Sequence, residues 1–259
     1  MNSSNYPDAR RSKKFNPFPK RRLDELLVER GLAGSLKKAQ ALIMSGQVLL
    51  ESGAAKNAGQ TAGTDAKIEI LSGPRFVSRG GDKLAGALKA FDISPVDMTC
   101  LDVGASTGGF TDCLLQSGAR RVYALDVGHG LLDAKLRSDP RVTVFEGENF
   151  RHFDVSRLPE RPALVAVDVS FISLKTVLPA LAASLDGRGL MLALVKPQFE
   201  AEPRDAPGGV VRDAAVRENI LQNIRTAAEA AGFAWRGKAD SVLKGPKGNQ
   251  ETFVYLEKK

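Results

Sequence analysis

Short apolar runs recur through the last two thirds of the chain, and stretches with helical spacing of apolar positions lie between most of them. Continuous apolar runs are typical of strands buried on both faces of a parallel sheet. The last two runs predict an antiparallel pair that closes the sheet. We therefore expect an α/β fold with a doubly wound sheet. The predicted strands are 99–103, 121–126, 142–146, 163–168, 189–196, 236–243 and 252–257.

The segment before residue 73 has a different pattern. Leu23, Leu26, Leu27 and the later Leu32 predict an amphipathic first helix that breaks at Gly31. Ser35 is placed to cap a second helix, which carries Ala39, Leu42 and Ile43 inward and ends at Gly46. Two short strands, 47–50 and 67–71, should follow. The segment therefore predicts a small α+β domain.

Proline placement and loss of periodicity set the domain boundaries. Residues 1–20 contain Pro7, Pro17 and Pro19 and show no periodicity, so we interpret them as a flexible basic arm. The small domain is expected over 21–72, a linker over 73–76, and the large α/β domain over 77–259.

Charge is distributed unevenly along the chain. The formal net charge is +7 and the pI about 9.5, yet residues 1–40 alone hold ten Lys or Arg against four Asp or Glu, a surplus of six. Such a concentration favours nucleic-acid binding, although a solvated tail is the alternative. If the two small helices pack together, a positive face is expected from Arg21, Arg22, Arg30, Lys37 and Lys38.

Composition excludes several other classes. No apolar run approaches the ~20 residues that cross a bilayer, and the basic start lacks the apolar core of a secretory signal, so a cytoplasmic protein is expected. Cys100 and Cys113 are interpreted as buried apolar side chains. With His129 and His152 as the only histidines, no zinc cluster of cysteine and histidine is expected. We expect a monomer that binds neither metal nor membrane.

The run from Leu101 to Phe110 carries the candidate chemistry, because an apolar strand leads directly into a glycine-rich turn that opens a helix. Glycines can adopt backbone angles closed to other residues and leave no side chain between the turn and a nucleotide. An ordinary strand-to-helix turn is the alternative. The candidate cofactor contacts in the turn are Gly104, Ser106, Thr107, Gly108 and Gly109.

Two acidic residues indicate which cofactor the turn holds. Asp126 ends the next strand about 20 residues after the glycines, the offset of an acid that binds a ribose. Asp102 precedes Gly104 by two residues, where it could bind the ammonium group of S-adenosylmethionine but would repel a pyrophosphate. The spacing is also G-x-x-x-G-G and not G-x-G-x-x-G. Both features favour S-adenosylmethionine over NAD.

Charged residues follow two more apolar strands. Asp168 and Lys196 come where strands finish, at the edge of the sheet where ligands gather. If the last strand runs antiparallel to the others, Glu251 at its beginning reaches the same edge. Lys83 precedes the first strand and could approach from the start of a helix. Asp168 or Lys196 alone could be a solvated strand end, but two such residues at the same edge as Asp102 and Asp126 indicate a site.

Two resemblances rest on longer motifs. The small domain resembles the RNA-binding domain named after ribosomal protein S-four, through 22–27, 35–39 and 43–48. Residues 22–259 resemble the haemolysin A (TlyA-type) ribosomal RNA 2'-O-methyltransferases, whose catalytic domain is similar to the FtsJ-like family. This second resemblance implies a Rossmann-like methyltransferase sheet. Its motifs are Ser78–Leu84, Asp102–Phe110, Asp168–Leu174, Val195–Glu200 and Gly248–Glu251.

The resemblance also implies roles. The family's Lys-Asp-Lys-Glu set falls on Lys83, Asp168, Lys196 and Glu251, and its substrates are cytidine riboses of 23S and, for some members, 16S rRNA. Its adenine-contacting position falls on Asn149, with Glu148 as a substitute. Lys196 is assigned to the 2'-hydroxyl as base or orienter, Lys83 to tuning, and the carboxylates to orienting the lysines. A non-catalytic RNA-binding or ribosome-assembly factor is the alternative function.

Overall fold

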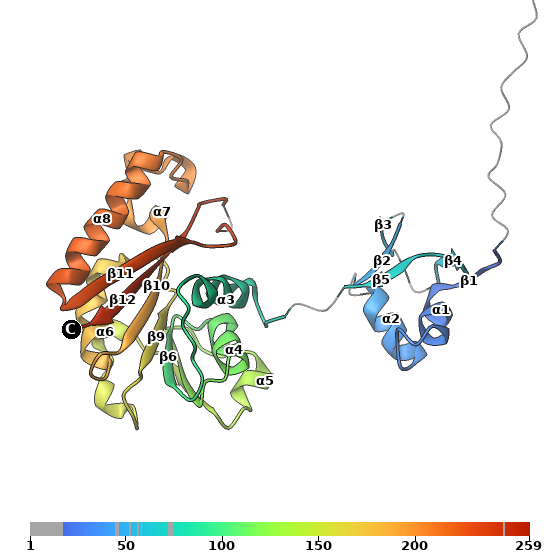
Figure 1. The fold of residues 1–259 in the computed structure, drawn as a ribbon, viewed down its shortest axis with the longest axis horizontal. Helices are drawn as coiled ribbons and strands as arrows, with labels where there is room; N and C mark the ends of the chain where they lie inside the picture. The colour runs from blue at the N-terminus through green and yellow to red at the C-terminus, as the bar shows by residue number, and fades with distance from the viewer. Residues whose placement is uncertain are drawn as a thin grey trace, which may run out of the picture. The chain divides into compact units, whose positions relative to one another are not determined.

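The computed structural model describes residues 18–44, 47–51, 53–55, 57, 59–71, 75–245 and 247–259. The chain divides into two compact units, Met1–Gly73 and Pro74–Lys259 (Figure 1). Three predicted features lie wholly or partly outside the described residues: most of the arm, the helix end at Gly46 and part of the linker. No described helix is long and apolar enough to cross a membrane.

The small unit contains the two predicted helices and more strands than the two that were predicted. Ser35 Oγ accepts a hydrogen bond from the Lys38 N–H at 3.2 Å, as expected of a helix cap. The elements of the small unit are β1 (Lys20–Arg22), α1 (Leu23–Glu29), α2 (Leu36–Met44), β2 (Val48–Leu50), β3 (Gly53–Ala54), β4 (Thr61–Gly63) and β5 (Ile68–Ile70). Strand β1 pairs with β4, and β2 pairs with β3 and β5, all antiparallel.

The core of the small unit is formed by the apolar faces of both helices. Leu23, Leu26 and Leu27 are buried in it, together with Ala39 and Ile43. The expectation for Leu32 was wrong, because α1 ends at Glu29 and leaves this side chain 37% exposed beyond it.

The large unit is built on one seven-stranded sheet. Its strands are β6 (Thr99–Val103), β7 (Arg121–Asp126), β8 (Val142–Glu146), β9 (Leu164–Val167), β10 (Leu190–Val195), β11 (Phe233–Asp240) and β12 (Thr252–Lys258). They lie in the order β11-β12-β10-β9-β6-β7-β8. Strands β6 to β10 run parallel, and β12 runs antiparallel to both β10 and β11, which confirms the predicted closing pair. The α-helices of the large unit are α3 (Arg79–Ala90), α4 (Gly109–Gln116), α5 (Ala134–Arg137), α6 (Leu178–Ser184), α7 (Pro197–Glu200) and α8 (Ala214–Ala230).

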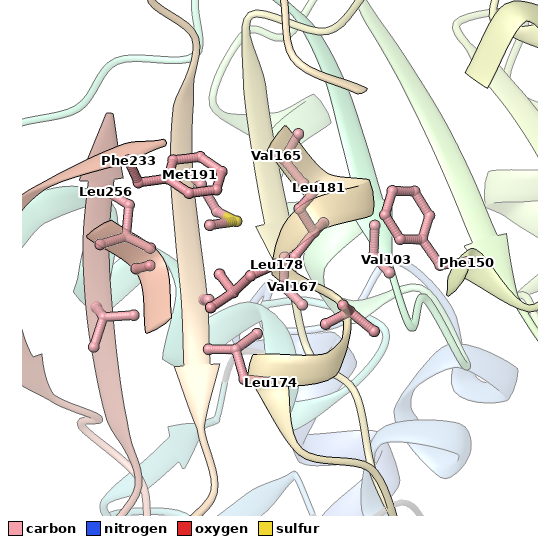
Figure 2. Packing of buried hydrophobic residues seen from close by; sticks show 14 of the residues in the cluster. Val103, Phe150, Val165, Val167, Leu174, Leu178, Leu181, Met191, Phe233 and Leu256 are labelled. Carbon is pink, nitrogen blue, oxygen red and sulfur yellow. The ribbon is translucent and has the colours of Figure 1, made fainter. Parts of the chain in front are cut away.

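Helices cover both faces of this sheet. Side chains alternate between the two faces along each strand, and the strands are apolar on both faces, so each face packs against helices. On one face, Leu101 and Val103 pack in a cluster with residues of α6 and α8. Figure 2 shows Val103 in this cluster with Leu178 and Leu181 of α6. On the other face, Cys100 packs with residues of α3, α4 and α5. The position between Leu101 and Val103, Asp102, therefore points toward α4.

The predicted extent of strand β11 was wrong by three residues at each end. Gly232 (φ +91°) lies between α8 and this strand, which begins at Phe233 and ends at Asp240. Phe233 is buried, whereas Val242, included in the predicted strand, is 62% exposed. Residues 241–243 instead belong to the loop before β12, where the Ser241 N–H donates to the Glu251 carbonyl at 2.8 Å.

The order of strands creates a switch point between β6 and β9. The chain passes outward from β6 to β7 and β8, then crosses back to place β9 on the other side of β6. The connections that leave the carboxyl ends of β6 and β9 therefore diverge, and ligands bind in the crevice between them. The residues at this edge are those that follow Val103, Val167 and Val195.

Candidate functional site

The glycine turn after β6 approaches the end of β9 closely. Gly104 has φ +88°, and the N–H groups of Gly104 and Ala105 donate to the Leu125 carbonyl. A Cβ on Gly104 would lie 2.5 Å from the Asp168 carbonyl oxygen, which is backbone and cannot move aside. Only glycine fits here, so the turn presents bare backbone at the switch point.

The next two glycines serve packing. Gly108 (φ +95°) precedes α4, and a Cβ there would lie 2.3 Å from a methyl carbon of Leu136. A Cβ on Gly109 would lie 2.2 Å from Ser78 Oγ, at the start of α3. Of the predicted turn contacts, Gly104, Ser106, Thr107 and Gly109 line a cavity between this turn and the start of α3, here called the α3 cavity. Gly108 lines neither this cavity nor the two others at this edge of the described part of the chain.

A cavity of about 470 Å³, here called the strand-end cavity, lies at the ends of β6, β7 and β9. Asp126 lines it, and its two carboxylate oxygens accept the N–H groups of Ser106 and Gly128, each at 2.7 Å. An ionised carboxylate has about four acceptor sites, so Asp126 retains capacity for two ribose hydroxyls. Both Asn149 and Glu148 line this cavity, so the two alternatives for the adenine contact remain open.

The apolar walls of the strand-end cavity were missed in the sequence. Val127 and Leu131 line it while 67% and 47% exposed, and Ile172 closes it from the connection after β9. Exposed apolar side chains on a polar-rimmed cavity are a mark of a binding site for a flat apolar group. The signal in the sequence was Val127, which directly follows the ribose candidate Asp126.

Asp102 is fully buried beneath the glycine turn and lines none of the three cavities described here. Its Oδ2 accepts the Thr111 hydroxyl at 2.7 Å, and Oδ1 has no hydrogen-bond partner within the described part of the chain. Burial raises the pKa of Asp102 to about 7; the Thr111 hydrogen bond opposes the shift, and the charges of Asp168 and Asp126 add to it. The sequence placed this carboxylate at the entrance of the turn, and the structure places it behind the turn.

Because its pKa rises on folding, Asp102 should make the protein less stable as pH increases. The folded state binds more protons than the unfolded state between about pH 4 and 7, so the free energy of unfolding falls across that window. From pH 5.5 to 7.5 we expect a loss of about 1 to 2 kcal/mol, at ~1.4 kcal/mol per pKa unit. Asp102→Asn should remove this dependence in urea titrations. Equal pH profiles for the two proteins would contradict the shift.

The four predicted catalytic residues converge as two ion pairs. Lys83 Nζ lies 2.5 Å from Glu251 Oε2, with both side chains nearly buried. Lys196 Nζ lies 2.7 Å from Asp168 Oδ1 and donates to Ser170 Oγ, also at 2.7 Å. Asp168 Oδ1 has no partner with hydrogen-bond geometry among the described residues, so this contact is mainly electrostatic. The antiparallel β12 brings Glu251 to the edge, and the second turn of α3 supplies Lys83.

Two further cavities flank these pairs. The α3 cavity, of about 460 Å³, lies between the glycine turn and the start of α3 and is lined by both Lys83 and Asp168. The α7 cavity, of about 380 Å³, lies beside α7 and is lined by both Lys196 and Glu251. Each cavity is thus lined by one member of each ion pair. A substrate held at either cavity reaches one of the two ammonium groups.

Glu200 fixes the two segments that carry the Lys196–Asp168 pair, and sequence reasoning missed it. Its carboxylate accepts the Ser173 hydroxyl and the Leu174 N–H, both at 2.6 Å. Burial raises the pKa of Glu200, opposed by these hydrogen bonds. The bonds tie α7, which follows Lys196, to the connection that follows Asp168. The acid at the end of the Val195–Glu200 motif was the signal.

An aromatic pair stands beside Lys196. Phe171 is 91% exposed at φ +63°, a conformation that a bulky residue rarely adopts. Its ring lies 5.1 Å from that of Phe199, and Lys196 Nζ lies 6.0 Å from the Phe199 ring. Both rings line the α7 cavity. This wall is apolar and open to solvent.

The predicted basic residues of the small unit divide into two groups. Three are held within the unit: Arg21 pairs with Glu29 at 2.7 Å, Arg22 with Asp24 at 2.8 Å, and Arg30 donates to two backbone carbonyls. The Arg22 hydrogen bond lowers the pKa of Asp24 strongly, against the effect of burial. Lys37 and Lys38 are exposed on α2, and neither forms an ion pair with a described residue.

No cluster of three metal-ligating side chains occurs in the described ranges. Cys100 and Cys113 are free and buried, and burial raises the pKa of each thiol to about 12. Thiols of this kind are protonated and unreactive.

A doubly wound sheet with a bare glycine turn and cavities at the switch point is the architecture of the Rossmann-like methyltransferases. Residues 76–258 match the FtsJ-like methyltransferase family, and the chain belongs to that family.

Relatives similar over nearly the whole chain include "16S/23S rRNA (cytidine-2'-O)-methyltransferase TlyA" of Mycobacterium tuberculosis, 44% identical over 91% of this chain and 89% of the relative. "Hemolysin A" of Brachyspira hyodysenteriae is 41% identical over 91% of this chain and 99% of its own length. A solved structure named "Putative hemolysin from Streptococcus thermophilus" has a TM-score of 0.72 at 40% identity, covering 93% of this chain and 90% of the other.

Proposed function

We propose that the protein transfers the methyl group of S-adenosylmethionine to the ribose 2'-hydroxyl of a cytidine in 23S rRNA, with 16S rRNA as a second candidate substrate. The observation that carries this proposal is the convergence of the Lys83–Glu251 and Lys196–Asp168 pairs beside the glycine turn. The relative of Mycobacterium tuberculosis, named for this activity, supports the choice of substrate.

The residues at the switch point fit this cofactor. The strand-end cavity suits an adenosine. Gly104 presents bare backbone, Asp126 has free acceptor capacity for the ribose, and Val127 and Leu131 are apolar. Asn149 or Glu148 would contact the adenine. S-adenosylmethionine would supply an electrophilic methyl group on a positively charged sulfur. The carboxyl of Asp102 is buried behind the turn, and its Oδ1 has no hydrogen-bond partner among the described residues. When ionised, it would favour such a cation without touching it.

The reaction requires the 2'-hydroxyl to lose a proton as it attacks. Lys196 orients the hydroxyl, and either accepts its proton or stabilises the developing alkoxide. Asp168 and Ser170 hold Lys196 in place, whereas Lys83, paired with Glu251, adds a second positive charge at the same edge. Much of the rate would come from alignment of the hydroxyl with the methyl group.

The direct test is incubation with a tritiated methyl donor and ribosomal subunits from cells that lack the protein. We expect label in 23S rRNA, at a ribose that mapping in matched cells shows to be methylated only when the protein is present. Binding to subunits without transfer of label would favour the alternative, a ribosome-assembly factor. A protein that acts on ribosomes would work in the cytoplasm, as a monomer in the simplest arrangement.

The small unit should supply part of the RNA affinity through Lys37 and Lys38 of α2, which are exposed and form no ion pair with a described residue. Each phosphate neutralised contributes about 0.7 to 0.9 to the slope of log K against log salt. Lys37→Ala/Lys38→Ala should weaken subunit binding and reduce that slope by about 1.4 to 1.8, whereas deletion of the arm and small unit should reduce it further. Unchanged binding over the salt series would exclude this role.

A further inference from the structure

The loop that joins β11 to β12 carries two exposed lysines, Lys244 and Lys247, which flank the catalytic edge. Lys244 lines the α3 cavity together with Lys83 and Asp168. Lys247 lines the α7 cavity together with Lys196 and Glu251. One loop therefore places a positive charge at each of the two cavities beside the ion pairs.

Neither loop lysine forms an ion pair with a described residue, although basic residues of the adjacent strand do. Arg236 pairs with Glu257 at 2.7 Å, and Lys238 pairs with Glu218. The acids that line the same cavities as the loop lysines, Asp168 and Glu251, pair instead with Lys196 and Lys83. The charges of Lys244 and Lys247 are therefore available to an anion from outside.

The backbone that presents these lysines is held by hydrogen bonds. The Gly245 N–H donates to the Asn249 carbonyl at 3.0 Å, and Gly248, at φ +89°, donates to the Gly245 carbonyl at 2.8 Å. Asn249 is buried, and its side chain bonds to the backbone of Gly209 and Val211. Arg79, at the start of α3, donates to the Lys244 carbonyl. Described residues whose backbone is held in this way can position a ligand.

We propose that Lys244 and Lys247 bind the two backbone phosphates on either side of the target ribose. This inference rests on the proposed function and identifies where the RNA strand crosses the large unit. A ribose whose 2'-hydroxyl reaches Lys196 carries one phosphate on its 5' side and one on its 3' side. Two cavities beside the ion pairs, each lined by one lysine that forms no ion pair with a described residue, match that arrangement of charge.

The test is the double variant Lys244→Ala/Lys247→Ala, measured for subunit binding over a salt series and for methyl transfer. Loss of two phosphate contacts should reduce the salt slope by about 1.4 to 1.8 and lower kcat/KM at least tenfold, with cofactor Kd unchanged. The matched control is Lys89→Ala/Lys259→Ala, which removes two exposed lysines that line none of the three cavities. The control should keep kcat/KM and change the slope less.

Three results would count against the inference, each in a different way. A slope and kcat/KM equal to wild type would overturn it while leaving the methyltransferase activity established. Weakened cofactor binding in Lys244→Ala alone would overturn the assignment of Lys244 and give that residue to the cofactor. Absence of subunit binding by the wild-type protein would overturn the proposed function, and this inference with it.

Discussion

Lys196→Ala should lower methyl transfer to ribosomal RNA by a factor of about 10² to 10⁴, the usual range for loss of a positioned acid or base, while cofactor affinity stays within about threefold of wild type. Lys196 stands at the end of β10 against Asp168 and Ser170 and lines the α7 cavity. It does not line the strand-end cavity in which we place the adenosine. Single-turnover transfer and calorimetric binding of the demethylated cofactor would measure the two effects separately.

Two further variants provide a control for that experiment and a test of proton removal by Lys196. Lys175→Ala removes an exposed lysine of the connection that follows Asp168. Lys175 lines none of the three cavities, so this variant should remain active. Lys196→Arg keeps the charge but cannot lose its proton near neutral pH. Holding an ordinary lysine neutral at pH 7 costs about 4.6 kcal/mol. Substantial activity in Lys196→Arg would therefore favour electrostatic stabilisation over proton removal. A folded, fully active Lys196→Ala would refute the role of this side chain.

The fold of the large unit could be predicted from sequence because its strands are continuous apolar runs with clear ends. Strands β6, β7 and β8 begin and end at the predicted residues. The small unit was harder, since its strands β1, β3 and β4 have only two or three residues each. Strands this short carry no readable alternation and depend on pairing with distant segments.

The candidate site was predicted where strand order alone decides position, and missed where side-chain direction decides it. Asp168, Lys196 and Glu251 follow from the edge at which strands end. Asp102 lies on the same strand as the apolar Leu101 and Val103, and the alternation of the strand turns it toward α4. Glu200 was missed because its partners, Ser173 and Leu174, come from a connection with no periodic pattern.

Glu251→Ala should be among the most destabilising single substitutions of the large unit. Lys83 has Glu251 as its ion-pair partner at 2.5 Å, and the two side chains are 11% and 1% exposed. Removing one member of a buried pair leaves an uncompensated charge and costs about 3 to 5 kcal/mol. For a chain of this size that loss lowers Tm by about 6 to 20 °C. Calorimetry of the variant would measure it, and a shift below about 2 °C would contradict the burial of this pair.

The double variant Lys83→Met/Glu251→Leu separates stability from activity. Replacing a buried pair by apolar side chains of similar size is often neutral or stabilising, so Tm should return toward the wild-type value. Methyl transfer should still fall by at least 10², because the second positive charge near the 2'-hydroxyl is gone. If the pair only held α3 to the start of β12, the stable double variant would be active. A stable but inactive double variant would instead place Lys83 in the reaction itself.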